Sequence, residues 1–178
     1  MSVTPIIRSF NRRVPYEWHN IVVAWKISMR TFEREQFLAI SIEQAWDFIS
    51  NPRNLAKITP ASLDFQIVSD VPELMHEGMT IEYRVKPLLG IAVPWISVIK
   101  DIRRPYTFTD EQMRGPYKSW KHVHVLREAP GGVLMEDRIS YAPPFDAICP
   151  WINAAIVLPQ LNKIFDYRSE TLTQLFGS

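Results

Sequence analysis

The chain has 178 residues, of which 47% are apolar and 22% are charged, and these proportions are typical of a globular protein with one domain-sized core. A formal net charge of +1 excludes a general electrostatic attraction to nucleic acid or to an anionic membrane, and no apolar run is long enough for stable insertion into a bilayer. The single cysteine, Cys149, excludes an internal disulfide framework and favours a cytoplasmic location.

Residues 1–30 differ in composition from the rest of the chain. They contain five basic residues against one acidic residue, Glu17, and they lack the clean apolar core and small-residue cleavage site of a signal peptide. We expect a loosely structured N-terminal extension here, followed by one folded domain over residues 31–178. The alternative is that the given sequence starts upstream of the natural first residue, which would then be Met29.

The folded part is predicted to begin with a strand and two short helices. Residues 32–40 alternate between two faces, which is typical of a strand. Ser41 and Gln44 then form a capping-box pattern that predicts a helix start, and Asn51 ends this helix because a residue before proline is pushed out of the helical conformation. Residues 53–58 can form a second short helix.

Six further strands follow, separated by turn sequences rich in glycine and proline. They are expected at residues 63–69, 79–86, 91–102, 106–112, 117–127 and 133–141. Because successive strands are joined by short turns, the resulting sheet of seven strands is predicted to be antiparallel.

A long C-terminal helix is predicted from Pro159 onward. Its apolar residues recur at spacings of three and four: Leu161, Ile164, Phe165, Leu172, Leu175 and Phe176. An earlier start near Ile148 would require a bend at Pro159, because proline removes a backbone hydrogen bond. This helix is the only predicted element with enough apolar surface to cover the sheet. We therefore predict an α+β fold in which a curved antiparallel sheet wraps around the helix and leaves a gap.

Polar side chains interrupt the predicted inner face of the sheet. His122 and His124 share one face of their strand with Trp120, and Asp137 lies on the mostly apolar face of the last strand. A buried carboxylate costs several kcal/mol unless it is paired or protonated. The expected partners of Asp110 and Asp137 are His122, His124 or Arg138. For Asp110, which precedes the Gly115 turn, a structural role in capping that turn is the preferred interpretation.

The two histidines are open to several interpretations. Together with Asp110 or Asp137 they could bind a metal, but the sequence has no further metal-ligand motif, so we predict neither a metal nor a cofactor. A carboxylate–imidazole pair could act as a general base beside a substrate carbonyl. The remaining interpretations are a pair of histidines that points outward, a satisfied structural pair in the core, and direct contact with a ligand.

Several segments resemble the SRPBCC (START/Bet v 1-like) ligand-binding superfamily. They are residues 45–60, 77–83, 86–90, 110–112, 115–117, 120–124 and 164–168. The resemblance covers about residues 31–176. Within the superfamily, the chain is similar in pattern to a bacterial branch of small, mostly uncharacterised members, some of which carry the label cell division inhibitor. Residues 1–30 and Pro159 depart from the family pattern.

The resemblance implies a helix-grip fold, with two short helices after the first strand and a hydrophobic cavity between the sheet and the C-terminal helix. The superfamily includes lipid carriers, quinone-binding proteins, hormone receptors and polyketide cyclases, so the fold does not fix the function.

We expect a non-enzymatic binding protein for an apolar ligand of lipid, isoprenoid or aromatic type. Its ligand-binding residues are predicted to be Tyr83, Trp95, Phe108, Asp110, Trp120, His122, His124, Met135, Asp137, Tyr141 and Phe165. The aromatic members of this set would equally suit a solid core. The first alternative is a cyclase- or dehydratase-like enzyme that uses His122, His124 and Asp137 as acid and base groups. The second is an interaction module that docks through its basic N-terminal segment. The sequence leaves the oligomeric state open.

Overall fold

Seven strands form one antiparallel sheet, as the sequence predicts, and their order across the sheet is β1-β7-β6-β5-β4-β3-β2. The computed structural model describes residues 28–88, 90–144 and 151–177, so almost all of the predicted N-terminal extension lies outside the described residues. The strands are β1 (Arg30–Leu38), β2 (Gln66–Ile67), β3 (Thr80–Leu88), β4 (Ile91–Arg103), β5 (Thr107–Arg114), β6 (Ser119–Ala129) and β7 (Gly132–Ala142).

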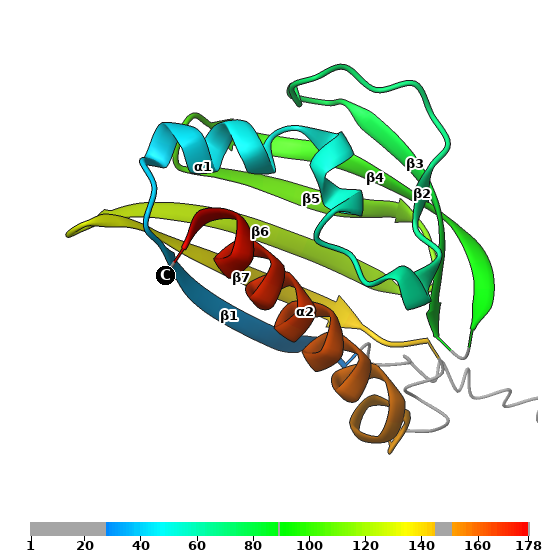
Figure 1. Cartoon of the computed structure of the whole chain (residues 1–178). Coiled ribbons are helices and arrows are strands. Elements are labelled where there is room, and N and C mark those ends of the chain that lie inside the picture. Colours follow the sequence, from blue (N-terminus) through cyan, green and yellow to red (C-terminus); the bar gives the residue numbers. More distant parts are fainter. Residues whose placement is uncertain (1–27, 89, 145–150, 178) are drawn as a thin grey trace, which may run out of the picture.

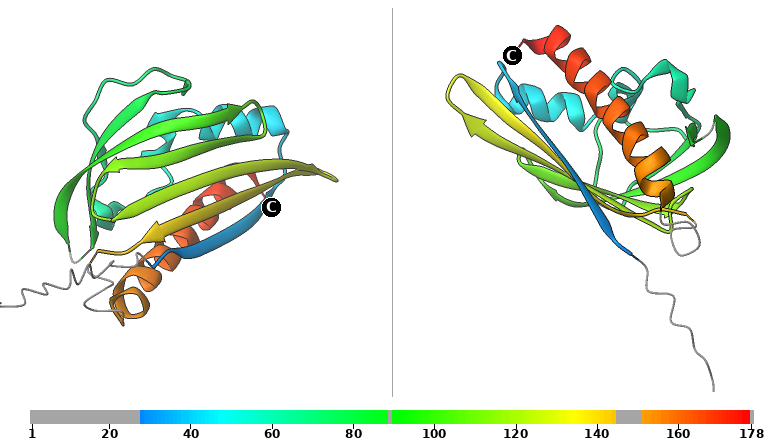
Figure 2. Two further views of the ribbon diagram at one scale, coloured as in Figure 1. Left: turned by 180° about the vertical axis from the view of Figure 1, so that it is seen from behind. Right: turned by 90° about the horizontal axis from the view of Figure 1, so that it is seen from below.

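The helices lie on one side of this curved sheet, and α2 runs along it as the closing element (Figure 1, Figure 2). They are α1 (Ile42–Ile49), the 3₁₀ turns η1 (Pro52–Ala56) and η2 (Ala61–Leu63), the π-helical turn η3 (Asn153–Val157) and α2 (Leu158–Phe176). This is the predicted helix-grip arrangement. Among the described helices, none combines the length and the apolar character needed to cross a membrane.

The predicted capping box at the start of α1 is present. The backbone N–H of Gln44 donates to Ser41 Oγ at 3.2 Å, and the backbone N–H of Ser41 donates to Gln44 Oε1 at 3.0 Å. These two bonds satisfy donors that the first helical turn leaves unpaired. The buried face of α1 then packs against β6 and β7.

Two predicted elements are shorter or tighter than expected. The strand predicted over residues 63–69 is reduced to β2, because Leu63 is the last residue of η2 and Asp64 adopts a left-handed conformation with φ of 45°. The second short helix is the 3₁₀ turn η1. It begins at Pro52 and is capped by the Asn51 side chain, which accepts from the Arg53 N–H at 3.0 Å.

A π-helical turn leads into α2. Pro159 has no N–H to donate, and its ring would collide with the preceding turn of a regular α-helix. The widened turn η3, which immediately precedes Pro159, accommodates both effects. The predicted earlier start near Ile148 falls outside the described residues.

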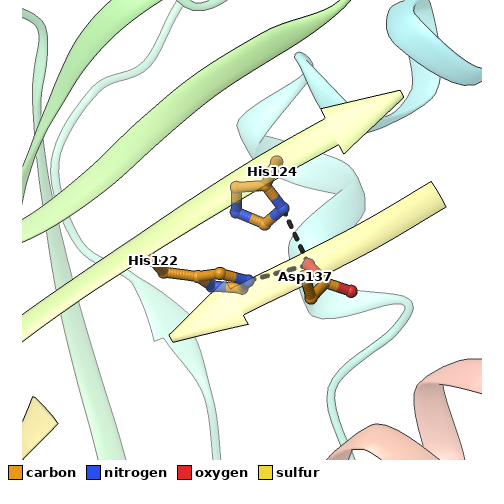
Figure 3. Close-up of side chains that lie close together, drawn as sticks. All are labelled: His122, His124 and Asp137. Atoms are coloured by element: carbon orange, nitrogen blue, oxygen red, sulfur yellow. Dashed lines mark hydrogen bonds and ion pairs between the residues drawn. The ribbon is translucent and has the colours of Figure 1, made fainter. Parts of the chain in front are cut away.

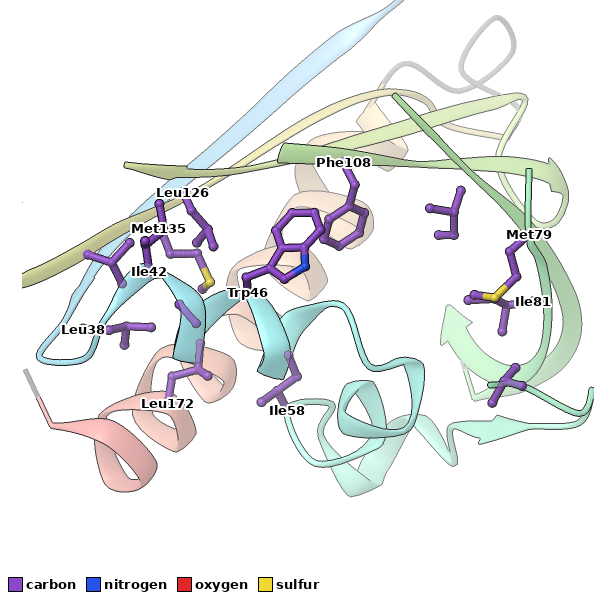
Figure 4. Packing of buried hydrophobic residues seen from close by; sticks show 14 of the residues in the cluster. Leu38, Ile42, Trp46, Ile58, Met79, Ile81, Phe108, Leu126, Met135 and Leu172 are labelled. Atoms are coloured by element: carbon purple, nitrogen blue, oxygen red, sulfur yellow. The ribbon is translucent and has the colours of Figure 1, made fainter. Parts of the chain in front are cut away.

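The apolar interior consists of two clusters. One lies beneath α1 and includes Trp46, Phe108 and Leu126 (Figure 4). The other lies beneath α2 and includes Trp120, Tyr141 and Phe165. Both clusters are built on the inner face of the sheet, so α1 and α2 cover neighbouring parts of one apolar surface.

Ser41→Ala removes the side-chain acceptor of the capping box. We expect the free energy of unfolding to decrease by about 1 kcal/mol, measured by urea denaturation. Ser41→Thr is the matched control, because it keeps a hydroxyl at the cap, and it should retain most of this stability. Equal stability of the alanine variant and the unmodified protein would show that the cap contributes nothing measurable.

Candidate functional site

A row of polar side chains crosses the inner face of the sheet, with one residue on each of five neighbouring strands. We call it the polar row, and its members are Tyr83 on β3, Ser97 on β4, Asp110 on β5, His122 on β6 and Asp137 on β7. Asp110 lies directly opposite His122 in the strand register, and Asp137 lies opposite His124, two residues further along β6. Because side chains alternate between faces, His124 points to the same side as His122.

Asp137 is the centre of a buried hydrogen-bonded cluster (Figure 3). His122 donates from Nε2 to Asp137 Oδ1 at 2.7 Å, and His124 Nδ1 lies 2.9 Å from the same oxygen. The two imidazole rings are in contact, with centroids 3.8 Å apart, and His124 stacks on Phe108. Asp137 is only 3% exposed, so this cluster is shielded from bulk water.

The cluster fixes the charge state of its members. Burial alone would raise the pKa of Asp137, but the hydrogen bonds from His122 and His124 and the charge of Arg168 outweigh it and hold that pKa well below its usual range. Burial lowers the pKa of His122 to about 3, and His124 and Arg168 act in the same direction. At neutral pH, Asp137 is therefore an anion and His122 is a neutral hydrogen-bond donor.

Arg168 supplies the balancing positive charge from α2. Its Nη1 lies 3.6 Å from Asp137 Oδ1, and its guanidinium lies over the Phe165 ring at 4.6 Å. The residue is 7% exposed, and an arginine remains protonated even when burial lowers its pKa. Sequence reasoning missed this residue, although Arg168 falls at helical spacing between Phe165 and Leu172.

Two sequence predictions about these carboxylates are wrong. Arg138 is not a partner of Asp137, because adjacent residues of a strand point to opposite faces, and Arg138 instead pairs with Glu136. Asp110 does not cap the Gly115 turn, because β5 continues to Arg114 and places Asp110 in mid-strand with its side chain facing the interior.

The cluster also contains the set of ligand atoms that would suit a metal ion. One ligand atom each from His122, His124 and Asp137 lies within 4.8 Å of the others. However, both ring nitrogens already face the Asp137 oxygen at hydrogen-bonding distance, and the Arg168 cation lies beside it. A divalent ion would have to displace these contacts and overcome repulsion from the guanidinium.

Two cavities lie beside the polar row, and they share Leu55, Tyr83, Asp110, His122 and Arg168 as lining residues. The first, with a volume of about 120 Å³, is also lined by the predicted residues Trp95, Trp120 and Phe165. The second, of about 50 Å³, is also lined by the predicted residues Phe108, His124, Met135 and Asp137. Tyr141 lines neither cavity, and its hydroxyl donates to Asn153 at 2.9 Å.

Four buried polar atoms on the wall of the first cavity have no hydrogen-bond partner among the described residues. They are Tyr83 Oη, Ser97 Oγ, Asp110 Oδ1 and Arg168 Nε. Buried polar atoms of proteins are nearly always hydrogen-bonded, so such atoms need an explanation. Burial raises the pKa of Asp110, and the nearby Ser97 hydroxyl, His124 and Arg168 only reduce this shift. Burial also raises the pKa of Tyr83 well above its usual value, and the neighbouring Asp110 adds to the effect.

A third hollow, of about 90 Å³, lies between β1 and α2. Arg34 and Gln36 of β1 line it together with Ser169 of α2, and it also reaches Asp137 and Arg168. Polar contacts join the two elements here: the Gln36 side chain donates to the Ser169 carbonyl at 2.9 Å, and Arg34 donates to the Asn162 side chain. The Asp137–Arg168 pair thus lies between the inner cavities and this outer hollow.

The fold is shared with solved structures of low sequence identity. Protein Ms6760 from Mycobacterium smegmatis is 18% identical, with a TM-score of 0.59 over 82% of this chain and 92% of that one. The major latex-like protein 151 from Panax ginseng is 12% identical, with a TM-score of 0.60 over 83% of this chain and 97% of that one. Ara h 8.0201 is 14% identical, with a TM-score of 0.51 over 83% of this chain and 99% of that one.

The fold of this chain is therefore Bet v 1-like. At such low identities, the likeness extends to the fold alone. No protein-family model matches the sequence, and no curated protein does. The site must accordingly be interpreted from its own residues.

His122→Gln should make stability less dependent on pH. In the unfolded chain, histidine gains a proton below its ordinary pKa of 6.5, whereas folded His122 does so only near 3. The unfolded state therefore binds more protons between these values, so the free energy of unfolding falls as the pH decreases. Between pH 6.5 and about 4.5, above the main carboxylate range, we expect His122 to account for a loss of about 2 kcal/mol.

The measurement is a series of urea denaturation curves across this pH range. The glutamine variant should lack that part of the slope, because glutamine can still donate a hydrogen bond but does not titrate. His76→Gln, at an exposed position, is the matched control and should keep the slope of the unmodified protein. Parallel slopes for all three proteins would show that His122 titrates normally in the folded state.

Arg168→Met should destabilise the protein through Asp137. The substitution keeps a long apolar side chain but leaves a buried carboxylate without its cation, which costs roughly 3–5 kcal/mol. Arg104→Met removes an exposed ion pair with Asp47 and should cost no more than about 1 kcal/mol. Denaturation at neutral pH compares the two, and equal losses would show that Arg168 does not stabilise the Asp137 anion.

Proposed function

We propose that this protein binds a small, mainly apolar molecule in the cavity between its sheet and α2, as a cytoplasmic member of the SRPBCC superfamily. One observation carries the proposal. The first cavity has an aromatic wall, yet four buried polar atoms on that wall have no partner among the described residues. A solid core would be expected to satisfy or exclude these atoms, whereas a binding site leaves them for the ligand.

The size of the cavity favours a compact ligand over a long acyl chain. An engineered protein cavity of about 150 Å³ binds benzene. The first cavity, of about 120 Å³, is of similar volume, and the smaller second cavity shares part of its wall. Among lipid-, isoprenoid- and aromatic-type ligands, a compact ring therefore fits best.

The wall also has the chemistry for a ring. Trp95 and Trp120 meet edge to face with centroids 5.3 Å apart, and the Tyr83 ring packs on Phe65 at 5.0 Å. Aromatic side chains interact favourably with another ring in either stacked or edge-to-face geometry. These contacts also hold the wall residues in place, so the ligand does not have to order them.

The enzymatic alternative has one observation in its favour. His122 lines both cavities, and its Nε2 is held by Asp137, an arrangement that leaves Nδ1 as the remaining acceptor of the ring. However, a general base works best with a pKa near the working pH, and burial lowers the pKa of His122 to about 3. Binding without proton transfer therefore agrees better with the electrostatics of the site.

Filling the cavity should abolish binding. Leu55 is half-buried on η1 and lines both cavities, so Leu55→Trp places a large ring in the shared space. Leu175→Trp adds the same ring to α2 at a side chain that is 51% exposed and lines neither cavity. Ethylbenzene, an apolar ring probe, should bind the unmodified protein and Leu175→Trp but not Leu55→Trp.

Calorimetric titration measures the affinity, and native mass spectrometry of freshly purified protein tests for a ligand carried from the cell. Circular dichroism checks that both tryptophan variants remain folded. Identical binding to all three proteins, or no bound small molecule and no affinity for any ring compound, would contradict the proposed function.

A further inference from the structure

We infer that the first cavity selects ring compounds through a hydrogen-bond-accepting oxygen, such as a ring-attached carbonyl, and that Tyr83 and a protonated Asp110 are its donors. This inference rests on the proposed function and specifies the chemistry of the ligand. Its basis is geometric: the atoms without partners belong to residues that line one cavity, three of them on the sheet and Arg168 on α2, and each belongs to a side chain that can donate a hydrogen bond.

The positions of the donors follow from the sheet. Tyr83 and Asp110 are on β3 and β5, and Ser97 lies on β4 between them, with all three side chains on the inner face. The Tyr83 hydroxyl and the Asp110 carboxyl are close enough to influence each other electrostatically. The tyrosine hydroxyl remains protonated at neutral pH because burial opposes its ionisation, so it is available as a donor.

Asp110 is the decisive group, because a carboxylate accepts hydrogen bonds whereas a carboxylic acid can also donate one. It lacks the two imidazole contacts that keep Asp137 ionised, and its Oδ1 has no partner among the described residues. Burial raises its pKa, which favours the neutral acid. A carboxylic acid kept neutral by an apolar site is a known donor to a developing or full negative charge on oxygen.

If Asp110 were ionised, a carboxylate among aromatic rings would instead be expected to bind a cationic ligand. The placement of Arg168 argues against it. The guanidinium lines the same cavity, and its Nε is one of the atoms without a partner. An ammonium group in this space would meet a buried positive charge, whereas a carbonyl oxygen would meet further N–H and O–H donors.

Three probes with the same carbon skeleton separate these chemistries: ethylbenzene is apolar, acetophenone adds a carbonyl oxygen, and 1-phenylethylamine adds an ammonium group. We expect acetophenone to bind most tightly to the unmodified protein in calorimetric titrations at neutral pH. One hydrogen bond to the carbonyl oxygen of acetophenone corresponds to roughly a two- to tenfold gain in affinity.

Substitutions at the two donors identify the contacts. Tyr83→Phe and Asp110→Ala should each weaken acetophenone binding by roughly two- to tenfold and leave ethylbenzene binding within twofold. Asp110→Asn is the discriminating variant, because its amide keeps a donor but cannot carry a negative charge. It should retain acetophenone binding, whereas a site for cations would lose 1-phenylethylamine.

Infrared spectroscopy reports the hydrogen bonds directly. The carbonyl stretch of isotope-labelled acetophenone should move to lower frequency on binding, and Tyr83→Phe should reverse part of this shift. The free protein should show the band of a protonated carboxyl group at neutral pH, and Asp110→Asn should remove it. These readings remain decisive if Asp110→Ala fails to fold, because the other two variants are close in size to the original residues.

The outcomes separate this inference from the proposed function. Tightest binding of 1-phenylethylamine, with loss in Asp110→Asn, would overturn the inference and establish a site for cations. Equal binding of ethylbenzene and acetophenone with no carbonyl shift would overturn it too, while ligand binding itself remained. If none of the three probes bound to the unmodified protein, just as none is expected to bind to Leu55→Trp, the proposed function itself would be overturned.

Discussion

An ionised carboxylate buried in an apolar interior constrains the whole arrangement. Asp137 must be neutralised, and the groups that do so come from β6 and α2. The two imidazole contacts are made only if β6 and β7 pair in the observed register, and the Arg168 contact is made only if α2 lies across the sheet at the observed height. A slip of one residue would turn the Asp137 side chain to the outer face. The charge cluster therefore specifies the geometry, even where its net contribution to stability is small.

The cavities follow from this geometry together with the size of the side chains. A curved sheet and a straight helix match imperfectly, and large aromatic residues fill most of the space between them. Trp120 and Phe165 belong to the cluster beneath α2, and Trp95 packs against it. All three also line the first cavity, so the same residues supply both the packing and the cavity surface. The polar row adds a line of hydrogen-bonding groups across a surface that is otherwise mainly apolar.

The parts of the structure that depend on local sequence rules could be predicted from the sequence. The alternation along β6 placed Trp120, His122 and His124 on one face, and the Ser41–Gln44 pattern located the start of α1. The seven-stranded antiparallel sheet and its closing helix also followed from the order of the elements. The type and order of the elements depend on periodicity, turns and caps within a few residues, which sequence patterns record well.

The parts that depend on long-range placement were not predicted. Arg168 is 31 positions from Asp137 in the numbering, and its contact with that carboxylate exists only after α2 has docked. Ser97 gave no signal, because a serine in an apolar strand can be buried or exposed equally well. The error over Arg138, in contrast, could have been avoided: its place beside Asp137 on one strand already requires it to face outward.

The distribution of the polar row over five strands has a consequence for how such a protein can change. Tyr83 Oη and Asp110 Oδ1 make no hydrogen bond to another described side chain, whereas His122 and Asp137 are hydrogen-bonded to each other. One end of the row is therefore held by hydrogen bonds within the framework, and the other end carries polar atoms without such bonds. Single-codon replacements of similar size at that second end, one strand at a time, could change the polarity of the cavity while the charge cluster that specifies the strand register stayed intact.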